Sequence, residues 1–240
     1  MLSARAHGEN GAVVALLTER NGRHAGYVHG AQSSKKRAMV EPGSRVSVTW
    51  SSRVSDALGT YHMEPDAGLP PGVMQDPLKL GALLSACALC DAALPEREGH
   101  AGLFYGLEAL IATLESEVWA ASYVMWELAL LKELGFGLDL TRCAMHGDPL
   151  TLSHVSPKSG RAVSAAAAAP YKERLLPLPD FLKPSGGGAD EADVYTGLTL
   201  TGYFLEHWVF AHHTKGVPEA RIRFHERFGK ALPAACAAAS

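Results

Sequence analysis

The spacing of apolar residues changes once along the chain, from the period of a strand to the period of a helix. Residues 12–18 form a short apolar run, AVVALLT, and the Asn-Gly pair that follows is the strongest short signal for a hairpin turn. A returning strand is expected over residues 25–29, and a last strand over residues 56–62. Between them the segment RVSVTW alternates, which predicts a half-buried strand with Val46, Val48 and Trp50 on one side.

Residues 1–64 therefore read as several short antiparallel strands with no helical pattern, which predicts a small barrel or sandwich. The segment 31–43 is polar and basic, ends in Pro-Gly, and is expected to be a loop. A connection rich in proline and glycine follows over residues 65–77. Such a composition is typical of a domain boundary.

From residue 78 onward the apolar positions recur every three to four residues, as they do on a helix. Helices are expected over residues 78–94, 103–114, 120–134 and 191–213, and from Pro218 onward. Residues 141–183 interrupt this pattern with a short hairpin around the turn SPKSG. The predicted fold is α+β and multidomain: a small antiparallel β-barrel over 1–64, a linker over 65–77, and an α-helical bundle over 78–240 with the insert 141–183.

The segment from Ala120 to His146 organises the helical part, and it places one carboxylate in an apolar stripe. Glu127 lies between Val124 and Leu131, on the side expected to face a core. A buried carboxylate is costly unless it is paired. Either Glu127 forms a structural pair with an Arg or Lys of another helix, or it is a catalytic acid. No second acid or nucleophile lies nearby in the sequence, which favours the structural pair.

Composition bounds the class of protein. Of 240 residues, 47% are hydrophobic and 20% are charged, which is ordinary for a globular protein. The chain has no apolar run of membrane-spanning length and no apolar signal core at its N-terminus, so neither a membrane partner nor export is expected. Four cysteines in a chain of this length do not form a disulfide framework, and a reducing cytoplasm fits them.

Charge is distributed unevenly along the chain. Residues 1–64 hold 8 Lys or Arg and 5 Asp or Glu, a balance of +3. The remaining residues hold 14 and 20, a balance of −6, and the two balances sum to the net charge of −3. Within residues 20–53, Glu41 is the only acid. The basic residues of this stretch are Arg20, Arg23, Lys35, Lys36, Arg37, Arg45 and Arg53. A basic module joined to an acidic one suits a chain that holds a polyanion at one end and proteins at the other.

These seven basic residues are the candidate DNA-binding site. Cations on a strand-rich surface neutralise phosphates and release counterions, and aromatic rings can stack on the bases of a single strand. Tyr27, Trp50 and Tyr61 are available, although Trp50 alternates with valines and belongs more naturally to the core. Lys158 and Arg161 extend the track more weakly. The alternative is that the basic segment is an ordinary solvated loop.

The motifs of catalysis and of metal binding are weak. Cys87-Ala-Leu-Cys90 and Cys143-Ala-Met-His146 together would give a Cys3His zinc shell, but the first pair lies in an apolar helical run where cysteines pack. His207, His212 and His213 lack the i, i+4 spacing of a helical metal pair. The sequence contains no nucleophile elbow, phosphate-binding glycine loop or dinucleotide motif. No catalytic residue is assigned, and the chain is not expected to be an enzyme.

Four segments together carry a resemblance to a known family. They are HGENGAVVALLTERNGRHAGYVHGAQSSKKR, WELALLKELGFGLDLTRC, VSPKSGRAVS and LLPLP, and they lie in the order found in the bacterial recombination mediator RecO. The resemblance covers nearly the whole chain, and its motifs are structural rather than catalytic. It implies that the N-terminal barrel is an OB-fold. RecO-like chains usually begin with several more residues, so the first strand is expected to be clipped and the closure of the barrel is in question.

The resemblance also has implications for metal. Many RecO-like proteins carry a four-cysteine zinc site after the central helix. Here Cys143 and His146 match the first pair, whereas the second pair falls at about Ser164 and Ala167, which are not normal ligands. His154 is the one further side chain that could supply a third ligand. The hairpin is therefore expected to be a degenerate zinc-finger-like segment that keeps its shape through packing, with no metal and no other cofactor.

The resemblance implies a mediator of DNA repair and homologous recombination. Such a protein binds single- and double-stranded DNA with little sequence preference and anneals complementary strands without a nucleotide. Its partners are RecR, the acidic C-terminal tail of the single-strand-binding protein, and RecF and RecA, in the bacterial cytoplasm at the nucleoid. Two other hypotheses stay open: a protein-interaction scaffold that binds no DNA of its own, and a small enzyme that uses Glu127 or the region of His207.

Overall fold

The computed structural model describes residues 1–54, 57–145 and 147–232, except for the side chain of Lys35. The chain divides into two compact units, one of Met1–Glu115 with Pro218–Arg221 and the other of Ser116–Val217 with Ile222–Ser240. Among the described residues no helix is long and apolar enough to cross a membrane.

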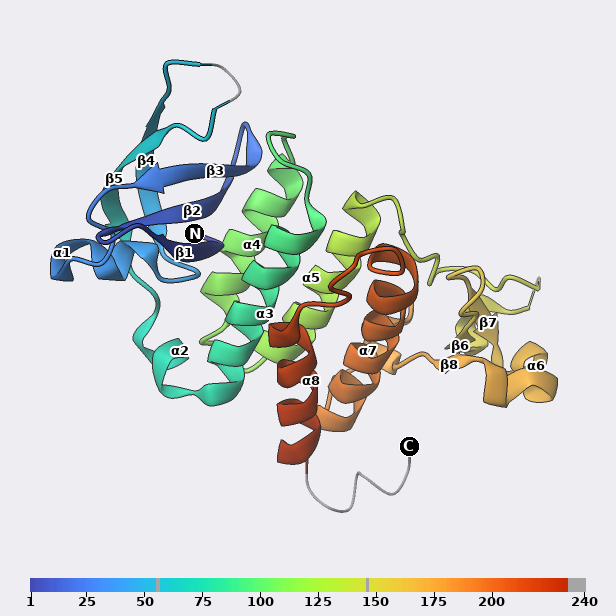
Figure 1. Ribbon diagram of the computed structural model, residues 1–240. Coiled ribbons are helices and arrows are strands. Elements are labelled where there is room, and N and C mark those ends of the chain that lie inside the picture. The colour runs from blue at the N-terminus through green and yellow to red at the C-terminus, as the bar shows by residue number, and fades with distance from the viewer. Residues whose placement is uncertain (55–56, 146, 233–240) are drawn as a thin grey trace. The chain divides into compact units, whose positions relative to one another are not determined.

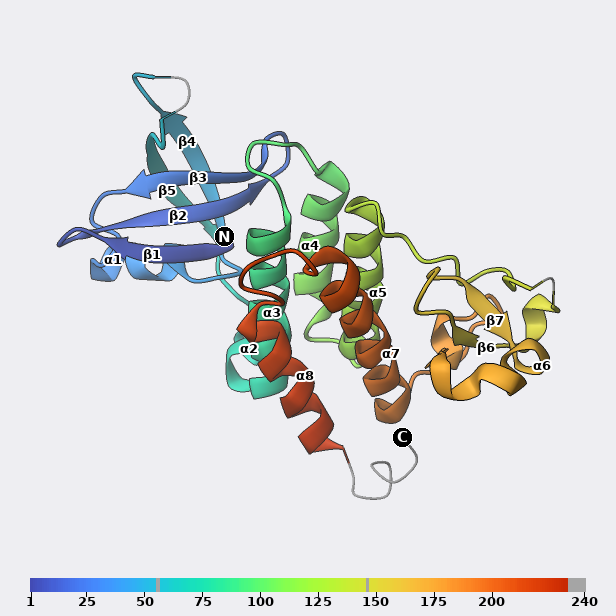
Figure 2. The same cartoon turned by 45° about the vertical axis from the view of Figure 1, so that its right-hand side comes forward.

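A five-stranded sheet forms the centre of the first unit (Figure 1). Its strands are β1 (Ser3–His7), β2 (Gly11–Thr18), β3 (Gly22–Val28), β4 (Arg45–Ser51) and β5 (Thr60–Ala67). They lie in the order β1-β2-β3-β5-β4, and all neighbours are antiparallel except β3 and β5. In the turned view of Figure 2, β4 and β5 cross behind β1, β2 and β3, so the sheet curls toward a barrel.

The inner face of this sheet follows from the alternation of the strands. Ala12, Val14 and Leu16 of β2 point inward, and Val46, Val48 and Trp50 of β4 pack against the same cluster, as the sequence predicts. The buried members of the cluster are Met1, Ala12, Val14, Leu16, Val28, Ala31, Met39, Tyr61 and Met63. A single apolar core therefore fills the barrel.

The barrel remains open between its edge strands, β1 and β4, which are not paired with each other. Strand β1 pairs with β2 over five positions, from Ser3 to His7. Across the opening, the Met1 amino group donates to the Ser44 carbonyl at 2.9 Å, and the Gly43 amide donates to the Met1 carbonyl at 2.9 Å. The first strand, which was expected to be clipped, is therefore present with five residues, and Met1 spans part of the opening.

Two sequence expectations in this unit need correction. Residues 31–43 are not only a loop, because they contain the short helix α1 (Ser34–Arg37) and a 3₁₀ turn, η1 (Ala38–Val40). The last strand begins at Thr60 and runs into the expected linker to Ala67, and its expected start at residue 56 lies outside the described residues. Pro65 is tolerated in it because the pairing with β4 is irregular between Arg45 and Val46.

Helices α2 (Pro71–Gln75), α3 (Pro77–Ala93) and α4 (Ala101–Thr113) complete the first unit, and Figure 1 shows α3 and α4 beside the sheet. Asp76 caps α3 by accepting from the amides of Leu78 and Lys79, and Pro77 occupies the first helical position. The sequence placed α3 and α4 in the helical domain, whereas their contacts place them in one compact unit with the sheet. The domain boundary at residues 65–77 stays a prediction.

Helices α5 (Trp119–Glu133) and α7 (Glu191–Phe204) form the centre of the second unit, with a π-helical segment η5 (Leu205–Val209) and α8 (Glu219–Ala231) from Ile222 onward. Gly135, with φ +85°, ends α5 as expected. The Tyr123 ring packs edge-on against Phe224, with centroids 4.7 Å apart. These aromatic contacts join α5 to α8 within the unit.

The predicted hairpin insert is confirmed. Strands β6 (Leu152–Val155) and β7 (Ala162–Ser164) are antiparallel, and β8 (Leu176–Pro177) pairs with the other side of β6. Gly160 makes the turn with φ +64°. The short helix α6 (Ala165–Ala168) and the 3₁₀ turns η2 (Pro149–Thr151), η3 (Ala169–Arg174) and η4 (Asp180–Leu182) flank this sheet.

Glu127 is fully buried, as its place in the stripe predicts. Its carboxylate accepts hydrogen bonds from the Tyr123 hydroxyl at 2.8 Å and from the Thr201 hydroxyl at 2.5 Å. Tyr123 lies on α5 with Glu127, and the bond from Thr201 ties α5 to α7. Both bonds match a structural role for the carboxylate, because a catalytic acid needs access to a substrate.

Candidate nucleic-acid interface

The structure places the seven candidate basic residues at both ends of the sheet rather than in one cluster. Arg20 lies in the β2–β3 turn. Arg53 follows β4, whose last residue, Ser51, is paired through Thr60 with the end of β3 at Tyr27. Lys36 and Arg37 belong to α1, which also follows the end of β3, so of these four residues only Arg20 lies at the start of that strand. The β2–β3 turn and the end of β3 are separated by the length of β3. Because β3 has seven residues, this length is roughly 20 Å at the usual rise of a strand.

Arg23, on the outward face of β3, is held by carboxylates. Its Nε lies 3.0 Å from an Asp91 carboxylate oxygen of α3, and its guanidinium lies 3.9 Å from Glu96. The Arg23 side chain is 23% exposed, and Asp91 is 11% exposed. Asp91 also accepts from the Ser3 hydroxyl at 2.8 Å. Arg23 therefore ties the sheet to α3, and its charge is already compensated.

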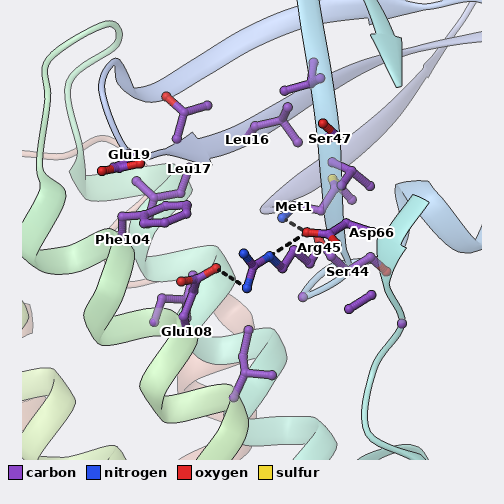
Figure 3. Close-up of a pocket in the computed structure, with 18 of the residues that line it drawn as sticks. Met1, Leu16, Leu17, Glu19, Ser44, Arg45, Ser47, Asp66, Phe104 and Glu108 are labelled. Carbon is purple, nitrogen blue, oxygen red and sulfur yellow. Dashed lines mark hydrogen bonds and ion pairs between the residues drawn. The ribbon is translucent and has the colours of Figure 1, made fainter. Parts of the chain in front are cut away.

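Arg45 is also ion-paired. Its guanidinium lies 2.7 Å from Asp66 of β5 and 3.1 Å from Glu108 of α4, and Figure 3 shows it between the two carboxylates. These groups line a cavity of about 460 Å³ between the start of β4, the end of β2 and α4. The remaining lining is mainly apolar, and it includes Phe104 and Leu17.

The other described cations are more available. Arg20, Arg37 and Arg53 are exposed, and no carboxylate lies within ion-pair distance of them in the described part of the chain. The Lys36 ammonium donates to the His29 carbonyl at 2.8 Å, which fixes the position of its charge beside the end of β3. Lys35 lies in α1, but its side chain is outside the description.

A further arginine, which the sequence reasoning missed, holds the β4–β5 connection. Arg97 precedes α4 and has φ +63°, a conformation that is uncommon for a residue with a side chain. Its guanidinium lies 5.6 Å from the centre of the Trp50 ring and donates to the Ala57 carbonyl at 2.9 Å. Its amide donates to the Arg23 carbonyl at 2.7 Å. Arg97 thus braces the segment that carries Arg53.

Under this brace the inner face of the barrel carries a buried polar pair. His24 Nδ1 and the Tyr61 hydroxyl are 2.6 Å apart, and the His24 ring packs edge-on against Trp50. Burial, followed by the Arg97 cation, lowers the pKa of His24. Burial raises the pKa of Tyr61. Both groups are therefore neutral near pH 7, which suits the interior of a barrel.

The cysteines fall into two environments. Cys87 and Cys90 are buried in α3, and burial raises the pKa of Cys87 to about 11, so they pack as the sequence suggests. Cys143 lies 3.5 Å from the Ser164 hydroxyl. Burial opposes ionisation of Cys143, but hydrogen bonds from Ser164, Met145 and Gly147 outweigh it and lower its pKa to about 7.

No group of three or more His, Cys, Asp or Glu side chains among the described residues could hold a metal ion. His146, the partner proposed for Cys143, lies outside the described residues, so the expected absence of zinc stays a prediction. His154, the candidate third ligand, is instead hydrogen-bonded to Ser153 through Nδ1 at 2.8 Å.

A curled β1-β2-β3-β5-β4 sheet with helices after it defines the class of the molecule, an OB-fold joined to a helical domain. The family models for the N-terminal and C-terminal parts of recombination protein O match residues 1–65 and 74–215, respectively. The chain therefore belongs to the RecO family of DNA repair and recombination proteins.

Named relatives extend over almost the whole chain. The DNA repair protein RecO of Rhodospirillum centenum is 52% identical over 234 residues, which cover 96% of this chain and 93% of the relative. The RecO protein of Caulobacter vibrioides strain NA1000 is 48% identical over 232 residues, 96% of each chain. That of Roseobacter denitrificans is 42% identical over 234 residues, 97% of each chain.

Proposed function

We propose that this chain is a recombination mediator that binds single- and double-stranded DNA through the outer surface of its OB-fold, largely without sequence preference. The observation that carries the proposal is the contrast among the basic residues of the barrel. Arg20, Arg37 and Arg53 are exposed and without a carboxylate in reach among the described residues, and Lys36 is anchored with its charge at the surface. Cations in this state bind phosphates at the smallest cost.

The spread of these cations over both ends of the sheet fits a chain-like ligand. A separation of roughly 20 Å, from the rise of strand β3, is several nucleotides of a single strand. Contacts to the phosphate backbone carry no sequence information, so binding of this kind is general. Neutralising two strands at one surface also lowers the cost of their encounter, and annealing then needs no nucleotide, metal or enzymatic step.

The partners proposed for this role are RecR, the acidic tail of the single-strand-binding protein, RecF and RecA, and the place of action is the bacterial nucleoid in the cytoplasm. Support comes from membership in the RecO family and from the acidic balance beyond residue 64. The described residues assign no pocket to any of these proteins.

The test is fluorescence anisotropy of a labelled oligonucleotide over a salt series, with wild type beside the double variant Lys36→Ala/Arg37→Ala. Each phosphate contact on a single strand contributes about 0.7 to the slope of log affinity against log salt. Loss of two contacts should therefore lower the slope by about 1.4, with weaker binding at low salt.

The matched control is Lys215→Ala/Lys230→Ala, which removes the same charge from exposed positions of the second unit. Its slope should stay that of wild type. If a folded wild-type protein binds no DNA at low salt, the interaction scaffold becomes the better proposal. If the two double variants weaken binding equally, net charge rather than the barrel surface accounts for the affinity.

A further inference from the structure

The outward face of the barrel is half covered and half open. Near Ser3 and Arg23 the side chains reach Asp91 of α3, which covers that half. The other half lies toward the β1–β2 turn and carries Tyr27 at half burial, with His7 and His29 exposed. These three rings are separate from the cations that are proposed to bind phosphates.

The three rings form an ordered set. The Tyr27 ring meets His29 edge-on with centroids 4.6 Å apart and an interplanar angle of 84°. It meets His7 on β1 in the same way, at 6.0 Å and 81°. Two imidazole rings therefore stand nearly perpendicular to one phenol ring. We name Tyr27, His7 and His29 the aromatic platform.

A glycine on the neighbouring strand lets Tyr27 lie along the sheet. Tyr27 pairs with Val13 in the register of β2 and β3, and its ring leans diagonally over Gly11. A Cβ at Gly11 would stand 1.8 Å from the Tyr27 hydroxyl oxygen. Any side chain at position 11 would therefore displace the Tyr27 ring. The ring can take its position because residue 11 is glycine.

A cation lies at the edge of the platform. The Lys36 ammonium donates to the carbonyl of His29, a member of the platform, at 2.8 Å. Arg37 is the next residue and is exposed. An aromatic surface beside fixed positive charge is the arrangement that binds a nucleotide, because the ring stacks on the base while the cation meets the phosphate.

We propose that the aromatic platform is a base-stacking site for single-stranded DNA, with Tyr27 as the stacking ring and Lys36 as the phosphate contact. This rests on the proposed DNA binding and adds a preference for unpaired bases. Double-stranded DNA keeps its bases stacked on one another and meets only the cations. The platform would therefore hold a single strand with an unpaired base stacked on Tyr27.

The first test needs no variant. Anisotropy is measured for wild type with a labelled oligothymidine and with an abasic strand of equal length and charge, at one salt concentration. Oligothymidine has little stacking of its own, so the comparison isolates stacking on the protein. A platform that holds one base predicts about fivefold to a hundredfold tighter binding of oligothymidine. Equal binding overturns the platform and leaves DNA binding intact, whereas no binding of either strand overturns the proposed function.

Variants then place the effect. Tyr27→Ala should remove the preference for oligothymidine, and Tyr27→Phe should keep it. Gly11→Ala should also remove it while leaving the tyrosine in the chain, because the added methyl displaces the far end of the ring. Lys36→Ala should weaken both strands by the same factor.

Tyr171→Ala is the matched control, since Tyr171 is an exposed tyrosine of the second unit. Its preference for oligothymidine should be that of wild type. If Tyr27→Ala and Gly11→Ala, both shown to be folded by circular dichroism, keep the full preference, stacking occurs elsewhere and the proposal is wrong.

Discussion

Strand β3 carries a histidine and aromatic cluster on each of its two faces, and the two clusters have opposite surroundings. On the inner face His24 is bonded to the buried Tyr61 and packed against Trp50, which is partly buried. On the outer face Tyr27 lies between His7 and His29 at the surface. The residue types are nearly the same. Only the alternation of the strand decides which cluster supports the fold and which can meet a ligand.

The same difference separates the cations. Arg23 and Arg45 point outward, but carboxylates of α3, α4 and β5 hold them. Arg37 and Arg53 also point outward and have no such neighbour in the described chain. Facing solvent is therefore necessary for binding a polyanion but not sufficient, and the predictions below separate the supporting groups from the binding ones.

The largest effect is expected at the inner cluster. Tyr61→Ala removes a ring that is 4% exposed and leaves His24 without its partner. Replacing a buried aromatic by alanine costs about 3–5 kcal/mol of unfolding free energy. Tyr27→Ala, on the outer face, should cost less than about 1 kcal/mol, as surface substitutions usually do. Urea unfolding followed by circular dichroism measures both losses of stability. Equal losses would mean that the outer cluster supports the fold as much as the inner one does.

The next effect concerns the tie between the sheet and α3. Asp91→Ala leaves the half-buried Arg23 and Ser3 without their common acceptor, and we expect a loss of about 2 kcal/mol in unfolding free energy. The control is Glu96→Ala, because Glu96 is 44% exposed and 3.9 Å from Arg23. It should change the stability by less than about 0.5 kcal/mol. If Asp91→Ala unfolds like wild type, Arg23 is a surface cation after all.

Much of the fold could be predicted because it depends on local pattern. Alternation located β4, the Asn-Gly pair located the β2–β3 turn, and the helical period located α5 within a few residues. The helix α1 was missed because four residues are too few to show a period of 3.6. The end of β5 was missed because Pro65 resembles a linker residue, and only the irregular pairing with β4 makes room for it.

The site could be predicted only in part, because ion pairing depends on distant residues. The sequence around Arg23 does not predict its ion pair with Asp91, which lies 68 positions later. Arg97 was likewise invisible, since its contacts lie on other segments. The aromatic platform did leave a signal: Tyr27 and His29 are two residues apart, so on one strand they share a face.

A pH series sharpens the comparison between the two faces. The pKa of His24 lies below its usual 6.5 in the folded protein, so between that pKa and 6.5 the unfolded chain binds more protons. The stabilising contribution of neutral His24 is complete above pH 6.5 and is lost as the pH falls through the folded pKa. Wild type should therefore lose more melting temperature between neutral and mildly acidic pH than His24→Gln does.

His154 needs its own control, because burial, followed by the Lys172 and Lys183 cations, also lowers its pKa. His154→Gln in the hairpin insert reports that separate share of the acid sensitivity. A wild-type profile that His24→Gln does not alter would place the acid sensitivity outside the barrel.

The smallest effect is expected at Arg45, and it tests the limit of the comparison. Arg45 is 60% exposed, so its pairs with Asp66 and Glu108 are screened by water and contribute about 0–1 kcal/mol to stability. Because these carboxylates already compensate the charge, Arg45→Ala should also weaken DNA binding less than Arg37→Ala, in the same anisotropy assay. If Arg45→Ala loses as much DNA affinity as Arg37→Ala or more, a DNA phosphate replaces the carboxylates as the partner of Arg45. The single substitution Glu108→Ala distinguishes these cases, because it releases Arg45 from one of its two carboxylates. It should strengthen DNA binding only if the Arg45 guanidinium can reach a phosphate.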